Sequence, residues 1–203
     1  MGDVINPLQK RDLWFVCHDA LQDERLISGA LDLAVRPSPR SRYDRLRKAL
    51  PEGEVLRFMT PTRRCHQTAA RLAAEFEWEE TDQLRARAMG AWEGSTWTQI
   101  REDDPVRAEA FWTAYGHGRA PGGGESLGDV RERLGGFLTG LTNRTDWTTA
   151  IVITHPEVVR VAVCDTIEAD LNNALRLTVD PLSVTRLSHT WVGWQVEATN
   201  LVP

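Results

Sequence analysis

The sequence predicts an α/β fold, a three-layer α/β/α sandwich with a mostly parallel central sheet. Short apolar segments typical of buried strands alternate with longer segments of helical composition, which is the order of a layered α/β protein. Three of these strands end abruptly on polar residues, at His18, Thr60 and His155. Because ligands bind beyond the carboxyl ends of the strands in such sheets, we expect a functional site at this edge.

The first half of the chain contains two of the predicted strands and two predicted helices. Residues 12–17 form a nearly continuous apolar run, as expected for a strand that is buried on both faces. A basic helix over 41–50 stops at Pro51, and a second strand covers 54–59. Residues 63–76 are rich in alanine and arginine, which favours a helix.

The second half predicts further helices, a third strand and a terminal hairpin. Helices over 104–117 and 126–140 are joined by a glycine-rich turn, with Ser126 as the candidate N-cap of the second helix. Residues 149–154 form the third strand, and a helix with an apolar face follows it. The alternation over 183–197 is typical of a hairpin. We expect the three strands to be central and parallel.

Length, charge and cysteine content exclude several classes of protein. The 203 residues suit one domain, expected to span 1–203. The net charge of −5 gives no electrostatic reason to expect a nucleic acid partner. No apolar run approaches the ~20 residues of a membrane helix, and the N-terminus lacks the apolar core of a signal peptide. Three cysteines are too few for a disulfide framework, so we expect a cytoplasmic protein without membrane contact.

The polar residues at the strand ends suit phosphoryl transfer. A neutral imidazole can attack phosphorus and form a phosphohistidine, and arginine can bind the transferred group through two hydrogen bonds. His18, Arg64 and His155 provide a nucleophile, a clamp and a second donor, and the helix that carries Arg64 adds backbone N–H groups. The cysteine and histidine spacings match no zinc motif, so neither a metal nor another cofactor is expected.

Four motifs follow one another along the chain: Thr-Pro-Thr-Arg-Arg-Cys-His-Gln-Thr-Ala at 60–69, Gly-Ala-Trp-Glu-Gly at 90–94, Pro-Gly-Gly-Gly-Glu-Ser-Leu at 121–127, and Ile-Thr-His-Pro-Glu at 153–157. Each resembles a motif of the histidine phosphatase superfamily, the phosphoglycerate mutase-like proteins. The resemblance covers nearly the whole chain. It implies a phosphoglycerate mutase-like fold, a phosphohistidine intermediate on His18, and phosphate binding by Arg64 and His155.

Three positions depart from the pattern of that family. Where the family has Arg-His-Gly, this chain has Cys17-His18-Asp19, so the nucleophile is kept while the clamping arginine and the glycine are replaced. The position of the usual general-acid glutamate is Ala86. We expect either Asp19 or Glu157 to act as the acid in its place.

The replaced positions predict a weakened pocket for phosphate. We expect Cys17 and Asp19 to flank the pocket. A carboxylate ~5 Å from the phosphate would repel it by ~3 kcal/mol at an effective dielectric of about 20. Arg25, Arg63 or Arg160 could supply the missing positive charge, and the sequence leaves the choice among them open.

Two hypotheses for the function follow. The first is a phosphohydrolase of a small phosphomonoester that forms phospho-His18, with Trp92 and Glu93 in the substrate pocket. The second is a non-catalytic or repurposed member that binds an anionic metabolite, or that uses Asp19 and His18 for acid–base chemistry without phosphoryl transfer. In both, the partner is a small phosphorylated or anionic metabolite, and the oligomeric state stays open, a homodimer included.

Overall fold

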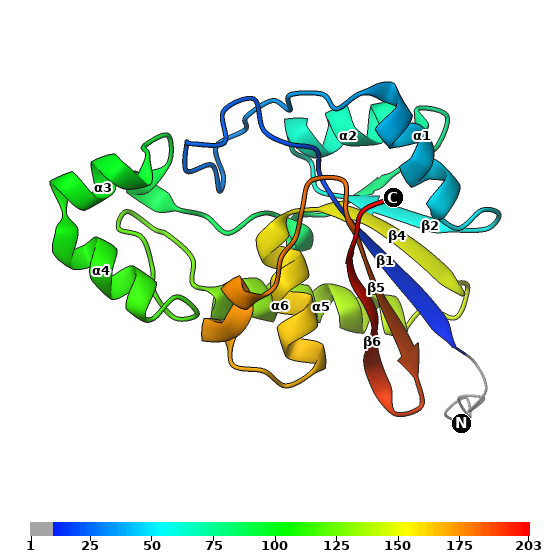
Figure 1. The fold of residues 1–203 in the computed structure, drawn as a ribbon. Coiled ribbons are helices and arrows are strands. Elements are labelled where there is room, and N and C mark those ends of the chain that lie inside the picture. Colours follow the sequence, from blue (N-terminus) through cyan, green and yellow to red (C-terminus); the bar gives the residue numbers. More distant parts are fainter. Residues whose placement is uncertain (1–9) are drawn as a thin grey trace.

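A six-stranded sheet forms the centre of the computed structural model, which describes residues 10–203 (Figure 1). The strands lie in the order β3-β2-β4-β1-β5-β6. Strands β2, β4 and β1 are adjacent and parallel, which confirms the predicted centre of the sheet, whereas β5 and β6 are added antiparallel. The bounds are β1 (Arg11–Cys17), β2 (Leu56–Met59), β3 (Glu79–Glu80), β4 (Thr149–Thr154), β5 (Val184–Thr190) and β6 (Gly193–Leu201).

Within residues 10–203, six α-helices accompany these strands: α1 (Arg40–Ala49), α2 (Arg63–Ala73), α3 (Trp97–Asp103), α4 (Pro105–Thr113), α5 (Leu127–Thr142) and α6 (Pro156–Thr166). The sequence predicted α4 as longer and did not predict α3. Helix α3 begins at a capping box between Thr96 and Gln99, and Asp104 ends it while capping α4. Since α3 is only seven residues long, its apolar periodicity is too short to detect.

Alternating side chains of the central strands build two apolar cores, one on each face of the sheet. Leu13 and Phe15 lie in the core that contains α5 and α6, whereas Val16 and Ile153 lie in the core that contains α1 and α2. Successive residues of a strand point to opposite faces, so this division shows that helices cover both faces. Val16 and Ile153 have no exposed surface. The predicted three-layer sandwich is therefore confirmed.

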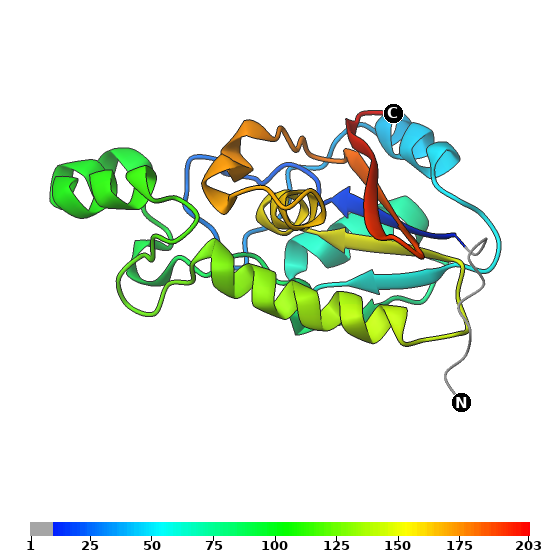
Figure 2. The ribbon, with the colours of Figure 1, turned by 90° about the horizontal axis from the view of Figure 1, so that it is seen from below.

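The carboxyl ends of β1, β2 and β4 point toward the end of the molecule where α3 and α4 extend beyond the sheet (Figure 2). The residues that follow these strands are therefore near one another and near the two helices. No helix within residues 10–203 is long and apolar enough to cross a membrane.

Candidate active site

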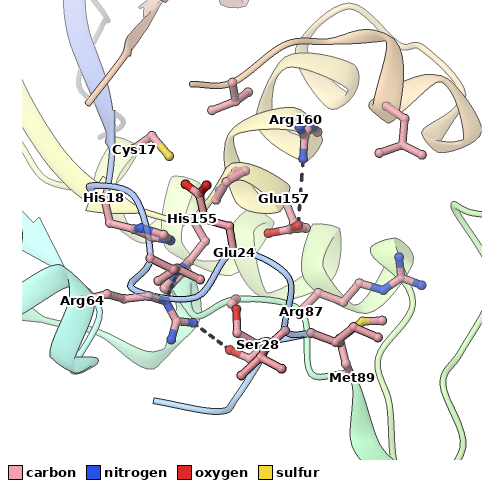
Figure 3. Close-up of a pocket in the computed structure, with 18 of the residues that line it drawn as sticks. Cys17, His18, Glu24, Ser28, Arg64, Arg87, Met89, His155, Glu157 and Arg160 are labelled. Carbon is pink, nitrogen blue, oxygen red and sulfur yellow. Dashed lines mark hydrogen bonds and ion pairs between the residues drawn. The ribbon is translucent and has the colours of Figure 1, made fainter. Parts of the chain in front are cut away.

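Three buried polar side chains meet at the carboxyl edge of the sheet (Figure 3). His18 follows β1, Arg64 lies in the first turn of α2 just after β2, and His155 follows β4 at the start of α6. The two imidazole ring centroids are 5.2 Å apart, and Arg64 Nε donates a hydrogen bond of 3.1 Å to His155 Nδ1. The structure thus brings together the three residues that the sequence assigned to phosphate chemistry.

The imidazole of His18 is held as a neutral base. Its Nδ1 lies 2.7 Å from the carbonyl oxygen of Asp19. A carbonyl oxygen only accepts, so Nδ1 carries the proton and Nε2 keeps its lone pair. Burial lowers the pKa of His18 to about 4, because the charged form loses its hydration. A neutral imidazole with an available Nε2 is the form that attacks phosphorus.

The second histidine is fixed in the opposite tautomer. Since Arg64 donates to Nδ1 of His155, the proton of this imidazole is on Nε2, which lies 3.0 Å from Thr60 Oγ1. The Thr60 hydroxyl in turn donates to Cys65 Sγ at 3.0 Å. Burial, followed by the nearby His18 and Arg64, holds the pKa of His155 well below its ordinary value. Both imidazoles are therefore neutral near pH 7.

Backbone carbonyl groups of one loop hold the guanidinium of Arg64. Its two terminal nitrogens donate to the carbonyl oxygens of Gly29, at 2.7 Å, and Leu31, at 2.9 Å. The Glu93 carboxylate holds the same loop, since it accepts from the backbone N–H groups of Ala30 and Leu31. Arginine has five N–H donors, of which three are used here, so two remain for an anion.

These side chains face a cavity of about 420 Å³. His18, Arg64 and His155 line the cavity together with residues of α4 and of the segment that precedes β5. This volume is within the range of pockets that bind small metabolites, and it exceeds what a phosphoryl group alone requires. Among residues 10–203, no group of three or more His, Cys, Asp or Glu side chains is placed to hold a metal ion.

Comparison with known proteins identifies the family. A family model described as the histidine phosphatase superfamily (branch 1) matches residues 13–202. The chain belongs to this superfamily. The resemblance read from the motifs is thereby confirmed.

Two proteins of Arabidopsis thaliana are similar in sequence to this member of the superfamily. Phosphoglycerate mutase-like protein 4 is 28% identical over 142 residues, which are 68% of this chain and 62% of that protein. Metal-independent phosphoserine phosphatase is 30% identical over 81 residues, which are 40% of this chain and 34% of that protein. The matched part therefore spans less than two thirds of either relative.

Two solved structures show the fold of the superfamily over nearly all of both chains. The protein YhfR of Bacillus stearothermophilus superposes with a TM-score of 0.85 at 24% identity, covering 95% of this chain and 98% of that one. The mycobacterial glucosyl-3-phosphoglycerate phosphatase superposes with a TM-score of 0.81 at 22% identity, covering 95% and 99%. At these identities the likeness shows a shared fold.

Asp19, which the sequence predicted beside the pocket, turns its side chain away from the cavity. Its two carboxylate oxygens accept hydrogen bonds from the backbone N–H groups of Ala20 and Ser38 and from the hydroxyl groups of Ser38 and Tyr43. Burial raises the pKa of this carboxyl, and the four hydrogen bonds outweigh that effect and keep the pKa below its ordinary value. The expectation that the Asp19 carboxylate flanks the pocket and repels phosphate is therefore corrected, because the carboxylate anchors the loop before α1.

The other two departing positions do line the cavity. Cys17 is buried, and burial, followed by the charge of Glu157, raises the pKa of its thiol, so the side chain is a neutral thiol. Ala86 lines the wall and contributes only a methyl group. Cys17 therefore brings no charge to the cavity, and Ala86 brings no group that could act as an acid.

Of the residues expected to compensate, Glu157 and Arg160 line the cavity. They lie in the first turns of α6 and approach each other to 3.9 Å (Figure 3). Arg25 forms an exposed ion pair with Asp23, and neither Arg25 nor Arg63 is among the lining residues.

Trp92 and Glu93 are placed behind the cavity wall. The Trp92 ring is buried and packs against Trp97 and Phe111, with centroid distances of 5.7 and 5.1 Å. Glu93 is the carboxylate that holds the loop around Arg64. The structure therefore corrects their expected place in the substrate pocket, because neither is among the lining residues.

Sequence reasoning missed Glu24 and Arg87, both of which line the cavity. Glu24 comes from the loop after β1 and forms an ion pair of 3.7 Å with Arg36, with its side chain 55% exposed. Arg87 is buried and donates to the carbonyl oxygens of Glu125, Tyr115 and Gly118. The sequence did offer a signal for Arg87, because it directly follows Ala86, a position that the motif resemblance had already assigned to the pocket.

Proposed function

We propose that the protein is a phosphohydrolase that transfers the phosphoryl group of a small phosphomonoester to His18 and then to water. The observation that carries this proposal is the neutral His18, with its Nε2 lone pair available at a cavity that also contains a buried arginine. Phosphatases in the same superfamily, including the metal-independent phosphoserine phosphatase, support this class of reaction.

The first half of the proposed reaction forms a phosphohistidine. The Nε2 lone pair of His18 forms a bond to phosphorus while the bond from phosphorus to the ester oxygen breaks, and the departing oxygen takes the proton of Glu157. The two unused N–H donors of Arg64 stabilise the charge on the phosphoryl oxygens.

The second half regenerates the free enzyme. A water molecule attacks phosphorus as the Glu157 carboxylate takes its proton, and the electrons of the N–P bond return to His18 Nε2. Inorganic phosphate is then released. All proton and electron transfers are accounted for by His18, Glu157, the ester and water, so the proposed reaction requires no cofactor.

We assign the acid to Glu157 because Asp19 is committed to four hydrogen bonds and Ala86 has no proton to donate. Glu157 lies two residues after His155, in the first turn of α6 and on the cavity wall. Its partner Arg160 is 3.9 Å away. Glu24 is the other carboxylate that lines the cavity, and it provides a matched comparison.

We propose further that turnover is slow, since Cys17 replaces one charge-assisted donor to the phosphoryl group. Loss of one such donor in an oxyanion hole typically costs about 3–4 kcal/mol of transition-state stabilisation. The second candidate, a member that binds an anionic metabolite without turnover, rests on the same replacement together with Ala86.

Phosphoenzyme trapping tests the nucleophile. The protein is incubated with p-nitrophenyl phosphate and quenched, and we expect mass spectrometry to locate an added phosphoryl group on His18. The variant His18→Ala should carry no phosphoryl group and should release no p-nitrophenol. Phosphate binding without any phosphoenzyme in the wild-type protein would instead support the non-catalytic candidate.

Two glutamate variants test the acid. We expect Glu157→Gln to lower kcat/KM for β-glycerophosphate by about 10²–10³-fold, the usual contribution of a general acid. The decrease should be far smaller for p-nitrophenyl phosphate, because p-nitrophenolate leaves without protonation. Glu24→Gln should change kcat/KM little for either substrate. An equal effect of Glu157→Gln on both substrates would contradict the assignment.

A further inference from the structure

Aromatic rings beside Arg87 line part of the cavity. Trp97, Phe111, Trp112 and Tyr115, from α3, α4 and the residues just after α4, all face the cavity. The rings of Trp112 and Tyr115 are stacked, with planes 7° apart and centroids 5.5 Å apart. Trp112 keeps 40% of its surface exposed although it belongs to this aromatic group.

The cations around the same cavity are already bound by groups of the protein. Arg87 donates to three backbone carbonyl groups, and its guanidinium lies 4.5 Å from the Phe111 ring centroid and 5.0 Å from the Tyr115 ring centroid. Arg160 donates to the carbonyl oxygen of Leu177 and pairs with Glu157. Among the lining arginines, Arg64 is the one that is hydrogen-bonded to a histidine, whereas Arg87 and Arg160 are held by backbone carbonyl groups elsewhere on the wall.

The charge of the lining is small. Three arginines, Arg64, Arg87 and Arg160, face two glutamates, Glu24 and Glu157, and both histidines are neutral. In the proposed reaction Glu157 holds a proton when the substrate binds, so the sum is 3 − 1 = +2. A phosphomonoester dianion balances this charge. A substrate with a second anionic group would bring an uncompensated charge into the cavity, at a cost in desolvation and repulsion.

We infer that the substrate of the proposed phosphohydrolase carries no anionic group other than its phosphate, and that its alcohol is an aromatic or similarly flat apolar ring that packs against Trp112 and Tyr115. This inference rests on the proposed function and adds the substrate class. The ring lies in the aromatic half of the cavity while the phosphoryl group lies at His18. Aromatic pairs of this kind add stabilisation beyond the area that they bury.

A panel of phosphomonoesters tests the substrate class. The panel pairs 2-naphthyl phosphate with β-glycerophosphate, O-phosphoserine, 3-phosphoglycerate and phosphocholine, and kcat/KM is measured for each. We expect 2-naphthyl phosphate to be preferred by about 10-fold or more over each of the others. A higher kcat/KM for O-phosphoserine or 3-phosphoglycerate would overturn the inference while leaving the phosphohydrolase standing. A higher value for phosphocholine would show that the rings bind a cation.

A tryptophan variant locates the ring. We expect Trp112→Ala to raise KM for 2-naphthyl phosphate by about 10-fold and to raise KM for β-glycerophosphate much less. The control is Trp191→Ala, a tryptophan that is 71% exposed in the turn between β5 and β6 and should affect neither substrate. Equal losses for both substrates in Trp112→Ala would overturn the inference.

A binding measurement tests this inference independently of the proposed function, because it does not require turnover. His18→Ala is titrated with 2-naphthyl phosphate and with inorganic phosphate, with tryptophan fluorescence as the readout. We expect the naphthyl ester to bind at least about 10-fold more tightly, and Trp112→Ala in the same background to remove the difference. Equal affinities would overturn the inference whether or not the wild-type protein turns over.

Discussion

Cys17 and Asp19 stand on either side of His18 in the chain, and their side chains have different surroundings. The thiol of Cys17 lies on the cavity wall, whereas the carboxylate of Asp19 points between the segment before α1 and α1 itself, where Tyr43 meets it. Residues two apart in an extended strand point to the same side, so the different directions of Cys17 and Asp19 show that the chain departs from the strand conformation after β1 ends at Cys17. The motif register predicted from the sequence was sufficient to locate His18, but the direction of the Asp19 side chain depends on Ser38 and Tyr43, which no motif identifies.

Restoring an arginine at position 17 should increase activity. We expect Cys17→Arg to raise kcat/KM for p-nitrophenyl phosphate by about 10-fold or more, since it adds a charge-assisted donor at the cavity wall. Cys17→Ser is the matched control, because it keeps the size of the side chain and adds no charge. An increase that is equal in both variants would show that the missing charge does not limit the rate.

Replacing Asp19 should affect stability. The buried carboxylate accepts four hydrogen bonds, so Asp19→Ala leaves several buried donors without an acceptor and should lower the free energy of unfolding by about 3 kcal/mol or more. Tyr43→Phe removes one donor only and should cost about 1 kcal/mol. Urea denaturation measures both.

The substitution of Asp19 by glycine would, on this account, reduce the folded fraction and would not improve phosphate binding. The test is the affinity of the folded protein for inorganic phosphate. Asp19→Asn with unchanged stability and at least tenfold tighter phosphate binding would contradict the placement of the carboxylate.

At the scale of elements, the segment over 29–31 connects Glu93 to Arg64. Its N–H groups donate to the Glu93 carboxylate and its carbonyl groups accept from the Arg64 guanidinium. Gly29 allows the segment to lie against the backbone of Arg87, because a Cβ atom at position 29 would lie 2.0 Å from the carbonyl oxygen of Arg87. In the proposed reaction Glu93 is therefore a positioning residue, which holds the Arg64 guanidinium through this loop.

We expect Glu93→Gln to weaken the binding of inorganic phosphate by roughly 10-fold, because an amide offers one acceptor oxygen where the carboxylate offers two. The loop then holds Arg64 less firmly. Isothermal titration with phosphate measures the change, and Glu109→Gln on the exposed face of α4 is the control. Unchanged phosphate affinity together with a lowered melting temperature would assign Glu93 to stability alone.

The long, strongly patterned elements could be predicted from the sequence, and the contacts between distant segments could not. Strand 149–154 coincides with β4, and Ser126 caps α5 through a capping box with Asp129. The apolar run and the capping residue are local signals, which explains this agreement. The aromatic half of the cavity depends on α3 and α4 folding over the edge of the sheet, and no local pattern specifies that arrangement.

At the scale of the whole molecule, the active-site histidines link folding to pH. In the unfolded chain a histidine has a pKa of about 6.5. Burial lowers the pKa of His18 to about 4 in the folded protein, and the pKa of His155 is lowered as well. Below pH 6.5 the unfolded chain therefore binds protons that the folded protein does not bind. The contribution to stability is fully present above pH 6.5 and is lost as the pH falls toward 4.

We therefore expect the free energy of unfolding to decrease between pH 6.5 and pH 5 by up to about 1.4 kcal/mol per pH unit for each of the two histidines. Urea denaturation at pH 7.5, 6.5, 5.5 and 5.0 measures this slope. His18→Asn should reduce the slope by about half, because one of the two linked protons is removed. The control is His117→Asn, at an exposed histidine that does not line the cavity. A free energy that is constant down to pH 5.0 in the wild-type protein would mean that both imidazoles accept protons in the folded state, and a cationic His18 could not attack phosphorus.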